Sequence, residues 1–221
     1  MPINKEKYQQ ILQELNGKAT LVAVSKTKSI EDIQELYNLG QRDFGENYVQ
    51  ELIEKEAALP KDIRWHFIGH LQSNKVKYIA PFIHLIHGID TLALLKEVNK
   101  QASKYNRTMA CLLQIYIAKE ETKFGLTEDE LETILNNSEF SQLKNVKIAG
   151  FMGMASFSND TKLIKKEFNY LKLLFNKNNN LPIINSQLLI LSMGMSADYK
   201  IALEEGSNMV RIGSLLFGKR D

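Results

Sequence analysis

The sequence alternates short apolar runs with amphipathic segments eight times, and this alternation limits the folds that the chain can adopt. The apolar runs have the length of strands and lie at residues 20–26, 41–47, 64–69, 82–90, 108–117, 146–155, 187–194 and 208–213. The segments between them carry apolar residues at helical spacing. Repeated strand–helix units predict parallel strands joined by right-handed crossovers. Eight units in 221 residues fit a closed (β/α)8 TIM-type barrel, which starts at roughly 200 residues.

An open, doubly wound α/β sheet is the rival architecture. It usually carries a glycine-rich phosphate loop, and the chain contains neither GxGxxG nor GxxxxGK[ST]. No linker, low-complexity segment or composition shift marks a second domain, so we predict that residues 1–221 form a single barrel domain. An extra helix is expected before the first strand, because Tyr8, Ile11, Leu12 and Leu15 recur at helical spacing.

Capping residues mark the starts of several expected helices. Ser29 is a candidate N-cap, and so is either Asp90 or Thr91 at the next long apolar stripe. Ser196 can cap a short helix that ends at Gly206. These signals support the assignment of helices between the strands.

Composition excludes several classes of function. The net charge is only +2 and no lysine–arginine stripe is present, so no nucleic-acid partner is expected. Cys111 is the only cysteine, and no Cys/His spacing indicates a metal site. The first residues lack the apolar core of a signal peptide, and no run is long enough to span a membrane. We therefore expect a cytoplasmic protein, and a monomer as small barrels can be.

The carboxyl ends of the expected strands carry the candidate site residues, because that end forms the active face of such barrels. These residues are Lys26, Asn47, His66, His70, Asp90, Met154, Ser156, Ser192, Gly194, Ser196, Arg211, Gly213 and Ser214. The segments SMGMS (192–196) and RIGS (211–214) follow the last two strands, where barrels commonly bind phosphate. Small residues and hydroxyls let backbone N–H groups approach an anion. Two such segments together predict a phosphate site.

Arg211 and Lys26 supply the charged groups of this site. Alternation along residues 208–213 puts Met209, Arg211 and Gly213 on one strand face, where a guanidinium needs an acceptor. That acceptor is a structural carboxylate, a bound anion or a heteroaromatic nitrogen. Lysines at strand ends usually extend into solvent, but burial near an arginine lowers the pKa of the amine and frees it to attack an aldehyde. A reactive lysine beside a phosphate site is what pyridoxal 5′-phosphate (PLP) requires. It is also what a Schiff-base aldolase acting on sugar phosphates requires.

Six segments of the chain resemble a known family. They are LVAVSKTK, GQRDFGENYVQE, WHFIGHLQSNK, FMGMAS, LSMGMSADY and VRIGSLLFG. In this order they are similar to the motifs of the pyridoxal-phosphate homeostasis protein family, the single-domain relatives of the alanine racemase N-terminal barrel. The resemblance runs from about Leu21 to Gly218, nearly the whole chain.

The resemblance implies a PLP fold-type III barrel, with the cofactor held as an aldimine on Lys26 of the VSKTK motif. The phosphate ligands that it implies are Ser192, Ser196, Gly213 and Ser214. Family members often have threonine in place of Ser214, and either hydroxyl can donate. Arg211 would face the pyridine nitrogen, and Asn47 and Met154 would line the ring.

The resemblance also indicates what the chain does with the cofactor. Arg211 would leave the pyridine nitrogen unprotonated, so the ring would stabilise carbanions less. Racemases of this fold compensate for that weaker stabilisation with a tyrosine from a second domain, which acts opposite the lysine as the other acid/base group. Because the sequence ends at Asp221, directly after the eighth unit, we expect no such second domain here, and we expect structural roles for His66, His70 and Tyr48. We predict a PLP-binding protein of vitamin B6 homeostasis that buffers or delivers the cofactor to PLP-dependent apo-enzymes, and that is not an enzyme. The alternatives are a weak amino-acid racemase and a Schiff-base aldolase.

Overall fold

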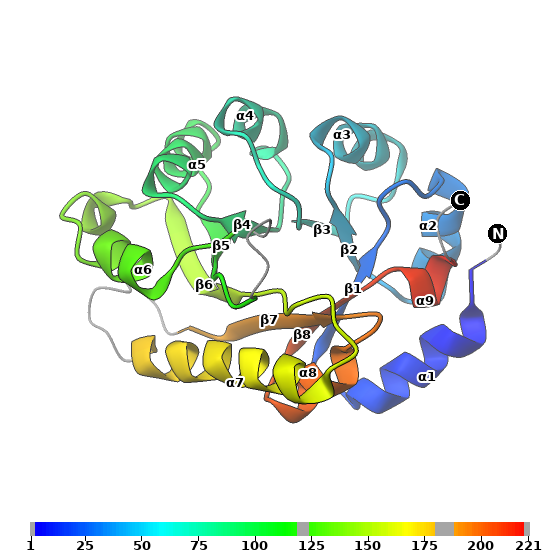
Figure 1. Ribbon diagram of the computed structural model, residues 1–221. Coiled ribbons are helices and arrows are strands. Elements are labelled where there is room, and N and C mark those ends of the chain that lie inside the picture. The colour runs from blue at the N-terminus through cyan, green and yellow to red at the C-terminus, as the bar shows by residue number, and fades with distance from the viewer. Residues whose placement is uncertain (1–2, 119–123, 180–187, 219–221) are drawn as a thin grey trace.

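Eight parallel strands form a closed barrel in sequence order (Figure 1). The computed structural model describes residues 3–118, 124–179 and 188–218. The strands are β1 (Thr20–Val24), β2 (Asp43–Glu46), β3 (Arg64–Phe67), β4 (Leu85–Ile89), β5 (Met109–Gln114), β6 (Val146–Met152), β7 (Ile190–Met195) and β8 (Met209–Ile212). The predicted (β/α)8 class is confirmed.

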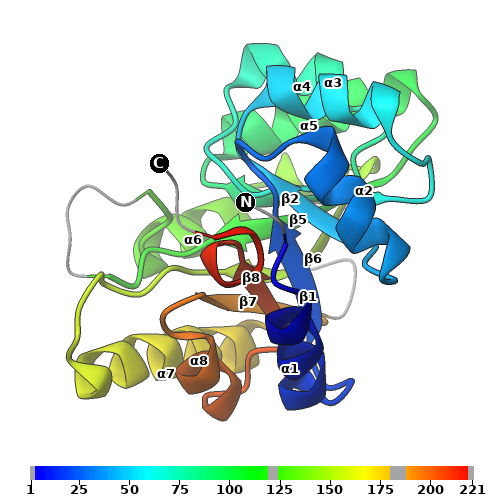
Figure 2. The same cartoon turned by 90° about the vertical axis from the view of Figure 1, so that its right-hand side faces the viewer.

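Helices surround the barrel, and those between α1 and α9 join consecutive strands (Figure 1). They are α1 (Lys5–Leu15), α2 (Ile30–Asn38), α3 (Val49–Ala58), α4 (Val76–Ile79), α5 (Leu92–Lys104), α6 (Glu128–Leu135), α7 (Thr161–Asn178), α8 (Tyr199–Glu204) and α9 (Ser214–Phe217), with 3-10 turns η1 (Ser73–Lys75) and η2 (Phe140–Gln142). The expected extra helix is α1, which lies beside β1 and α9 (Figure 2). Asn4 N donates to Leu216 O at 2.8 Å and ties its start to α9.

Side chains alternate between the inside of the barrel and the layer under the helices, as the period of a strand requires. The inner cluster is Val22, Leu85, Leu112, Ala149, Met152 and Met209. Val210 and Ile212 point the other way and join the larger cluster beneath the helices. Arg211 is therefore on the inner face with Met209, as the alternation in the sequence predicts.

Closure brings the two ends of the chain together. β1 pairs with β2 on one side and with β8 on the other, with Val22 opposite Arg211 and Ala23 opposite Ile212. Because all the strands are parallel, residues that follow β1, β7 and β8 lie at the same end of the barrel.

Several strands are shorter than the apolar runs that predict them. The run 82–90 contributes only β4, and the run 108–117 only β5. Ile83 and Ile117 are buried outside the strands, so their apolar character reflects core packing and not sheet pairing. Ile115 is also buried, and it pairs beyond the end of β5 in an isolated bridge with Leu126. The first residue of the run 187–194 lies outside the described residues.

Two of the predicted helix caps form and one does not. Ser29 and Thr91 each accept a hydrogen bond from the backbone N–H three residues on. The prediction for Ser196 is wrong, because the N-cap of α8 is Asp198. Ser196 Oγ instead accepts from Gly213 N at 3.3 Å, since a turn carries the chain away from β7 before α8 begins.

Replacing Thr127 by alanine is expected to lower the free energy of unfolding by about 1 kcal/mol. Thr127 and Glu130 form a capping box at the start of α6, in which each side chain accepts from the other residue's backbone N–H. Thr133→Ala on the exposed face of the same helix is the control, and it should be neutral or slightly stabilising. Urea unfolding measures both, and equal stabilities would contradict the cap.

The remaining predictions that concern the fold involve metals, thiols and membranes. Burial raises the pKa of the Cys111 thiol to about 12, so this residue behaves as the small apolar side chain that the sequence indicates. Among the described residues, no group of three or more His, Cys, Asp or Glu side chains could hold a metal ion. No helix in the described part of the chain is long and apolar enough to cross a bilayer.

Candidate functional site

The carboxyl ends of the strands meet at one end of the barrel, which we call the mouth. Eight residues are implied by the family resemblance to contact the cofactor, and six of them follow a strand by one or two positions and so lie there: Lys26, Asn47, Met154, Ser196, Gly213 and Ser214. Ser192 and Arg211 lie within β7 and β8 and point into the barrel. The fold thus brings six of the eight residues to one place and sets two below it.

The backbone on both sides of Lys26 is held in place by side chains from neighbouring elements. Ser25 Oγ donates to Glu46 Oε1 at 2.6 Å, and Ser25 O accepts from Lys55 Nζ at 2.8 Å. On the other side, the N–H of Thr27 donates to the Glu51 carboxylate. Thr27 has a φ of 63°, in the left-handed region. Lys26 itself is half-buried, and it lies at the mouth between two residues whose backbones are hydrogen-bonded to side chains of α3.

A buried ion cluster supplies those contacts. Lys55 Nζ lies 2.8 Å from Glu46 Oε1 and 2.6 Å from Glu51 Oε1. Burial raises the pKa of Glu46, and the Lys55 ammonium offsets only part of that effect. Glu46 Oε2 is buried with no hydrogen-bond partner among the described residues. The cluster is therefore held at some cost in stability, and its contacts converge on the loop that carries Lys26.

Small residues near the ends of β7 and β8 allow neighbouring elements to approach closely. Gly213 N donates to Ser196 Oγ at 3.3 Å, and a Cβ on Gly213 would lie 3.0 Å from Val24 O. Gly194 has a φ of 97°, and a Cβ there would lie 2.6 Å from Ala202 Cβ. These positions need glycine, and the hydroxyl and N–H groups beside them are the donors that an anion would use.

Arg211 is almost fully buried, with 4% of its surface exposed. Its Nη1 donates to Ser192 O at 2.9 Å and to Ser192 Oγ at 2.7 Å, and its Nη2 donates to Gly153 O at 3.0 Å. Burial lowers the pKa of the guanidinium to about 10, while Asp198 acts in the opposite direction. The ion pairs of the described residues do not include Arg211, so carbonyl and hydroxyl oxygens hold it.

Ser192 is the predicted phosphate residue that the structure does not bring together with the others. Its hydroxyl is fully buried and contacts Arg211 and His87, the latter at 3.3 Å from Nδ1. Ser196, four residues further on, lies at the mouth beside Gly213. The motif LSMGMS extends across the strand end, so its two serines occupy different levels of the barrel.

Asn47 and Met154 lie at the mouth as predicted, with different contacts. Asn47 Oδ1 is buried and has no hydrogen-bond partner among the described residues. Met154 is half-buried and packs on the inner cluster of the barrel. Asn47 thus offers an unsatisfied polar atom, and Met154 an apolar surface.

Two of the three acid/base candidates of the sequence have structural contacts. Tyr48, the third, is the N-cap residue of α3, but its side chain makes no capping hydrogen bond and is 56% exposed. His70 lies 3.3 Å from an Asp90 oxygen and stacks on Phe124. His66 faces the barrel interior, fully buried, and contacts other polar side chains there.

Two functional candidates in the barrel interior escaped the sequence analysis. Asp43 Oδ1 lies 3.0 Å from His66 Nε2, and His66 Nδ1 lies 2.9 Å from His87 Nε2. Asp43 starts β2 within the segment GQRDFGENYVQE, which assigned it no role, and His87 is in the middle of β4, outside the six quoted segments. Strand alternation alone could have placed both side chains inside, opposite the outward Phe44 and Ile86.

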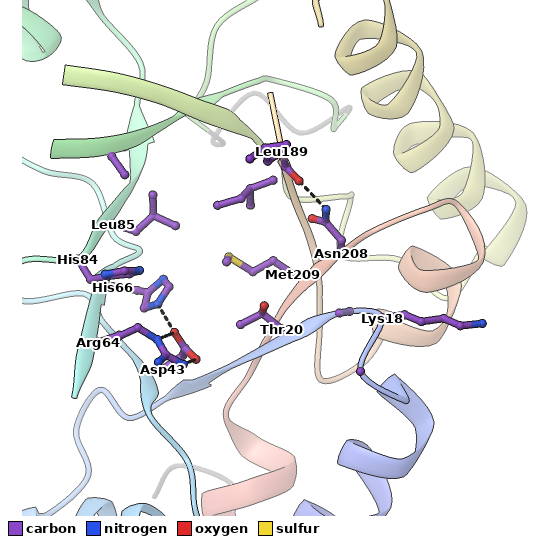
Figure 3. Close-up of a pocket in the computed structure, with 14 residues that line it drawn as sticks. Lys18, Thr20, Asp43, Arg64, His66, His84, Leu85, Leu189, Asn208 and Met209 are labelled. Atoms are coloured by element: carbon purple, nitrogen blue, oxygen red, sulfur yellow. Dashed lines mark hydrogen bonds and ion pairs between the residues drawn. The ribbon is translucent and has the colours of Figure 1, made fainter. Parts of the chain in front are cut away.

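A cavity of about 540 Å³ opens at the opposite end of the barrel from the mouth (Figure 3). Its lining includes the first residues of six strands: Thr20, Asp43, Arg64, Leu85, Ile190 and Met209. Asp43, Arg64 and His66 project toward one another at its wall (Figure 3). The interior polar groups therefore extend toward solvent at this end.

Asp43→Asn is expected to remove about 2 kcal/mol of stability at neutral pH and almost none near pH 2. Burial acts to raise the pKa of Asp43, but hydrogen bonds from Arg64 and His66 outweigh it and hold the pKa at about 2. A carboxylate whose pKa is lower in the folded state than in the unfolded state stabilises the fold at pH values above its unfolded-state pKa, near 4. This stabilisation is lost as the pH falls toward 2.

Urea unfolding at a series of pH values tests this prediction. The difference in unfolding free energy between wild type and Asp43→Asn should shrink as the pH falls from 5 to 2. Glu139→Gln, at the exposed pair with Lys96, is the control and should change stability little. A difference that is constant across this range would contradict the prediction.

These features define a class of protein: a closed (β/α)8 barrel with a lysine after β1, a buried arginine in β8, and glycine–serine loops after β7 and β8. The profile of the family "Alanine racemase, N-terminal domain" matches residues 4–221. The chain belongs to this family, and within it to the pyridoxal phosphate homeostasis proteins.

Relatives of known name support that assignment. The chain is 40% identical to the pyridoxal phosphate homeostasis protein of Aquifex aeolicus over 203 residues, which cover 91% of this chain and 87% of that protein. It is also 40% identical over 215 residues to the human protein of that name, covering 91% of this chain and 76% of that protein.

Solved structures agree. PipY of Synechococcus elongatus is 33% identical and superposes with a TM-score of 0.89 without PLP, covering 96% of this chain and 99% of that one. With PLP bound, PipY is 34% identical and has a TM-score of 0.87 at the same coverage. Alanine racemase from Bartonella henselae, at 16% identity and a TM-score of 0.73, covers 95% of this chain and 56% of that one. That last similarity concerns the fold alone.

Proposed function

We propose that this protein binds PLP reversibly through Lys26, to buffer or deliver the cofactor, and that it does not turn over a substrate of its own. The observation that carries the proposal is the shared mouth. Lys26 lies there on a loop that is hydrogen-bonded on both sides. Val24, two residues earlier, packs against Gly213 of the Ser196–Gly213 contact, and the buried Arg211 is opposite Val22 in the barrel. PipY, whose structure has been solved with PLP bound, and the names of the relatives support the cofactor.

The residues at the mouth fit PLP. Asn47 Oδ1 is a buried atom without a partner among the described residues, and a polar group of the cofactor would satisfy it. The amide can present either end, because its orientation is assigned from the hydrogen-bond network. The hydroxyls of Ser196 and Ser214 and the N–H of Gly213 would hold the phosphate, and Met154 would pack on the ring.

PLP supplies, when bound, an aldehyde that condenses with amines and a ring that accepts electron density. Lys26 Nζ would form a C=N bond to the aldehyde carbon and release one water, and the reverse hydrolysis would free the cofactor. Arg211 uses three of its five N–H donors on the protein. A remaining N–H would donate to the pyridine nitrogen and keep it unprotonated, so that the ring stabilises carbanions weakly.

The lack of turnover is part of the proposal. A racemase needs a second acid/base group opposite the lysine, and two of the three candidates have other contacts. His70 pairs with Asp90, and His66 contacts Asp43 and His87. Tyr48 is exposed at the start of α3, and its side chain makes no capping hydrogen bond there. The contacts of the two histidines favour binding and release over catalysis.

Borohydride reduction followed by mass spectrometry of the peptides tests cofactor and site together. The protein reconstituted with PLP should be yellow, and the reduced adduct should be on the peptide that contains Lys26. A colourless protein that cannot be reconstituted would overturn the proposal, and an adduct on Lys28 would move the site. Chiral chromatography of amino acids incubated with the protein tests turnover, and brisk racemisation would contradict the non-catalytic role.

Three further properties stay predictions of the sequence: a monomeric state, a cytoplasmic location, and delivery to PLP-dependent apo-enzymes. We also propose that residues 1–221 work as one domain. β1 and β8 pair with each other, so the removal of either strand would open the barrel.

A further inference from the structure

Five polar side chains form a continuous hydrogen-bonded line through the interior of the barrel, which we call the interior chain. It runs from Arg211 below the mouth to Ser192 (2.7 Å), His87 (3.3 Å), His66 (2.9 Å) and Asp43 (3.0 Å). All five residues are buried. Among the described residues, none of their side-chain polar atoms is left buried without a partner.

Donor chemistry gives this line one direction. An arginine can only donate, so Ser192 Oγ accepts from Arg211. The serine proton then needs an acceptor, and His87 Nδ1 is the other partner that its hydroxyl has in the described part of the chain. A buried hydroxyl that failed to donate would lose a hydrogen bond, so Nδ1 of His87 carries no proton.

The same reasoning continues to the carboxylate. With Nδ1 unprotonated, neutral His87 donates from Nε2 to His66 Nδ1, which therefore carries no proton either. His66 then donates from Nε2 to the Asp43 carboxylate, which also accepts a hydrogen bond from Arg64 Nε. Each assignment is forced by the one before it. Arg211 is the positive end of the line and Asp43 is the negative end.

We propose that the interior chain positions Arg211, with Ser192, His87 and His66 as positioning residues that connect the arginine to the distant Asp43 carboxylate. One part of this proposal rests on the function proposed above, namely that the group Arg211 is positioned to contact is the pyridine nitrogen of PLP. The assignment of protons concerns the protein alone.

This arrangement answers a problem that burial creates at Arg211. A buried guanidinium is stabilised by a carboxylate or by many hydrogen bonds, and no ion pair among the described residues involves Arg211. A carboxylate in direct contact would neutralise its charge and compete for the N–H groups that face the mouth. The interior chain instead orients one side of the guanidinium from below, through hydrogen bonds that polarise one another in one direction. The other side stays available to a ligand.

Long-range 1H–15N NMR of the 15N-labelled protein without PLP tests the assignment directly. The chain has four histidines, so single replacements assign each ring. We expect His66 and His87 to be neutral at pH 7, each with its proton on Nε2. A proton on Nδ1 of His87, or two protons on either ring, would overturn the proposal.

Matched replacements at His87 test the effect on Arg211. His87→Leu removes the acceptor for Ser192, whereas His87→Asn keeps an amide oxygen near the position of Nδ1. We expect PLP to bind about tenfold more weakly to the leucine variant, with a shifted absorbance maximum of the bound cofactor. The asparagine variant should recover most of both. Equal losses in the two variants, in proportion to their melting temperatures, would indicate a packing role and overturn the proposal.

His84→Asn is the control, because the His84 ring lies near that of His66, at 5.5 Å between ring centres and tilted by 53°, without belonging to the interior chain. Its affinity for PLP and the spectrum of bound PLP should match wild type. If the wild-type protein does not bind PLP, the function proposed above fails, while the NMR assignment still supports or overturns the interior chain.

Discussion

Lys26→Ala is expected to abolish covalent attachment of PLP. Alanine has no amine, so borohydride should fix no cofactor to the peptide that contains residue 26. The residues proposed for the phosphate remain, so we expect residual reversible binding about a hundredfold weaker than wild type, which corresponds to about 2.7 kcal/mol. Absorbance titration with PLP and mass spectrometry after reduction measure both effects.

Lys28→Ala is the matched control for that experiment. Lys28 is two residues further along the same loop, and its Nζ donates to Phe217 O at 3.1 Å. Its replacement should leave the labelling of Lys26 intact. Because Lys26 is only half-buried, the Lys26→Ala variant should unfold at nearly the same urea concentration as wild type. Undiminished labelling of Lys26→Ala would show that another amine carries the cofactor.

Lys55→Met is expected to have the largest effect on stability, about 3–5 kcal/mol, because it leaves buried carboxylate charge without its partner. Lys55 contacts Glu46, Glu51 and the carbonyl of Ser25. Methionine matches the length of the stem but makes none of these bonds. The loop before Lys26 loses its support at the same time, so attachment of PLP should also slow. Urea unfolding and stopped-flow absorbance measure the two losses.

Two further variants separate burial from charge in that result. Lys61→Met breaks an ion pair with Glu56 in which the lysine side chain is 64% exposed, and should cost no more than about 0.5 kcal/mol. Glu46→Gln combined with Lys55→Met removes both charges of the buried pair and should recover much of the stability. A loss in Lys55→Met no larger than in Lys61→Met would contradict the cluster.

The positions of most candidate residues could be predicted from local patterns. The strand–helix alternation predicts the barrel, and the parallel barrel brings every strand end to one mouth, so Lys26, Asn47, Ser196 and Gly213 arrive there from distant parts of the sequence. Alternation along β8 likewise predicts that Arg211 points inward. These inferences need only the period of a strand and the polarity of a parallel sheet.

Local patterns could not predict how deep a residue lies along the barrel axis, in the interior or at the mouth. Ser192 and Ser196 belong to one motif, yet one contacts Arg211 in the interior and the other contacts Gly213 at the mouth. The register of β7 against β8 shifts between Ser192 and Met195, and a shift of this kind leaves no trace in a hydrophobic pattern. The strand ends themselves were misplaced where apolar loop residues continue the core.

The fold class, the shared mouth and the inward arginine could all be predicted from the sequence, because they follow from short-range periodicity repeated along the chain. The partners of the polar groups could not, because they depend on how distant strands meet. Asp43, His66, His87 and Ser192 come from four different strands, and they meet because closure turns four inward faces toward one axis. The Glu46–Lys55–Glu51 cluster likewise forms where β2 meets α3. Contacts between distant elements depend on distances across the barrel, which no local spacing in the chain records.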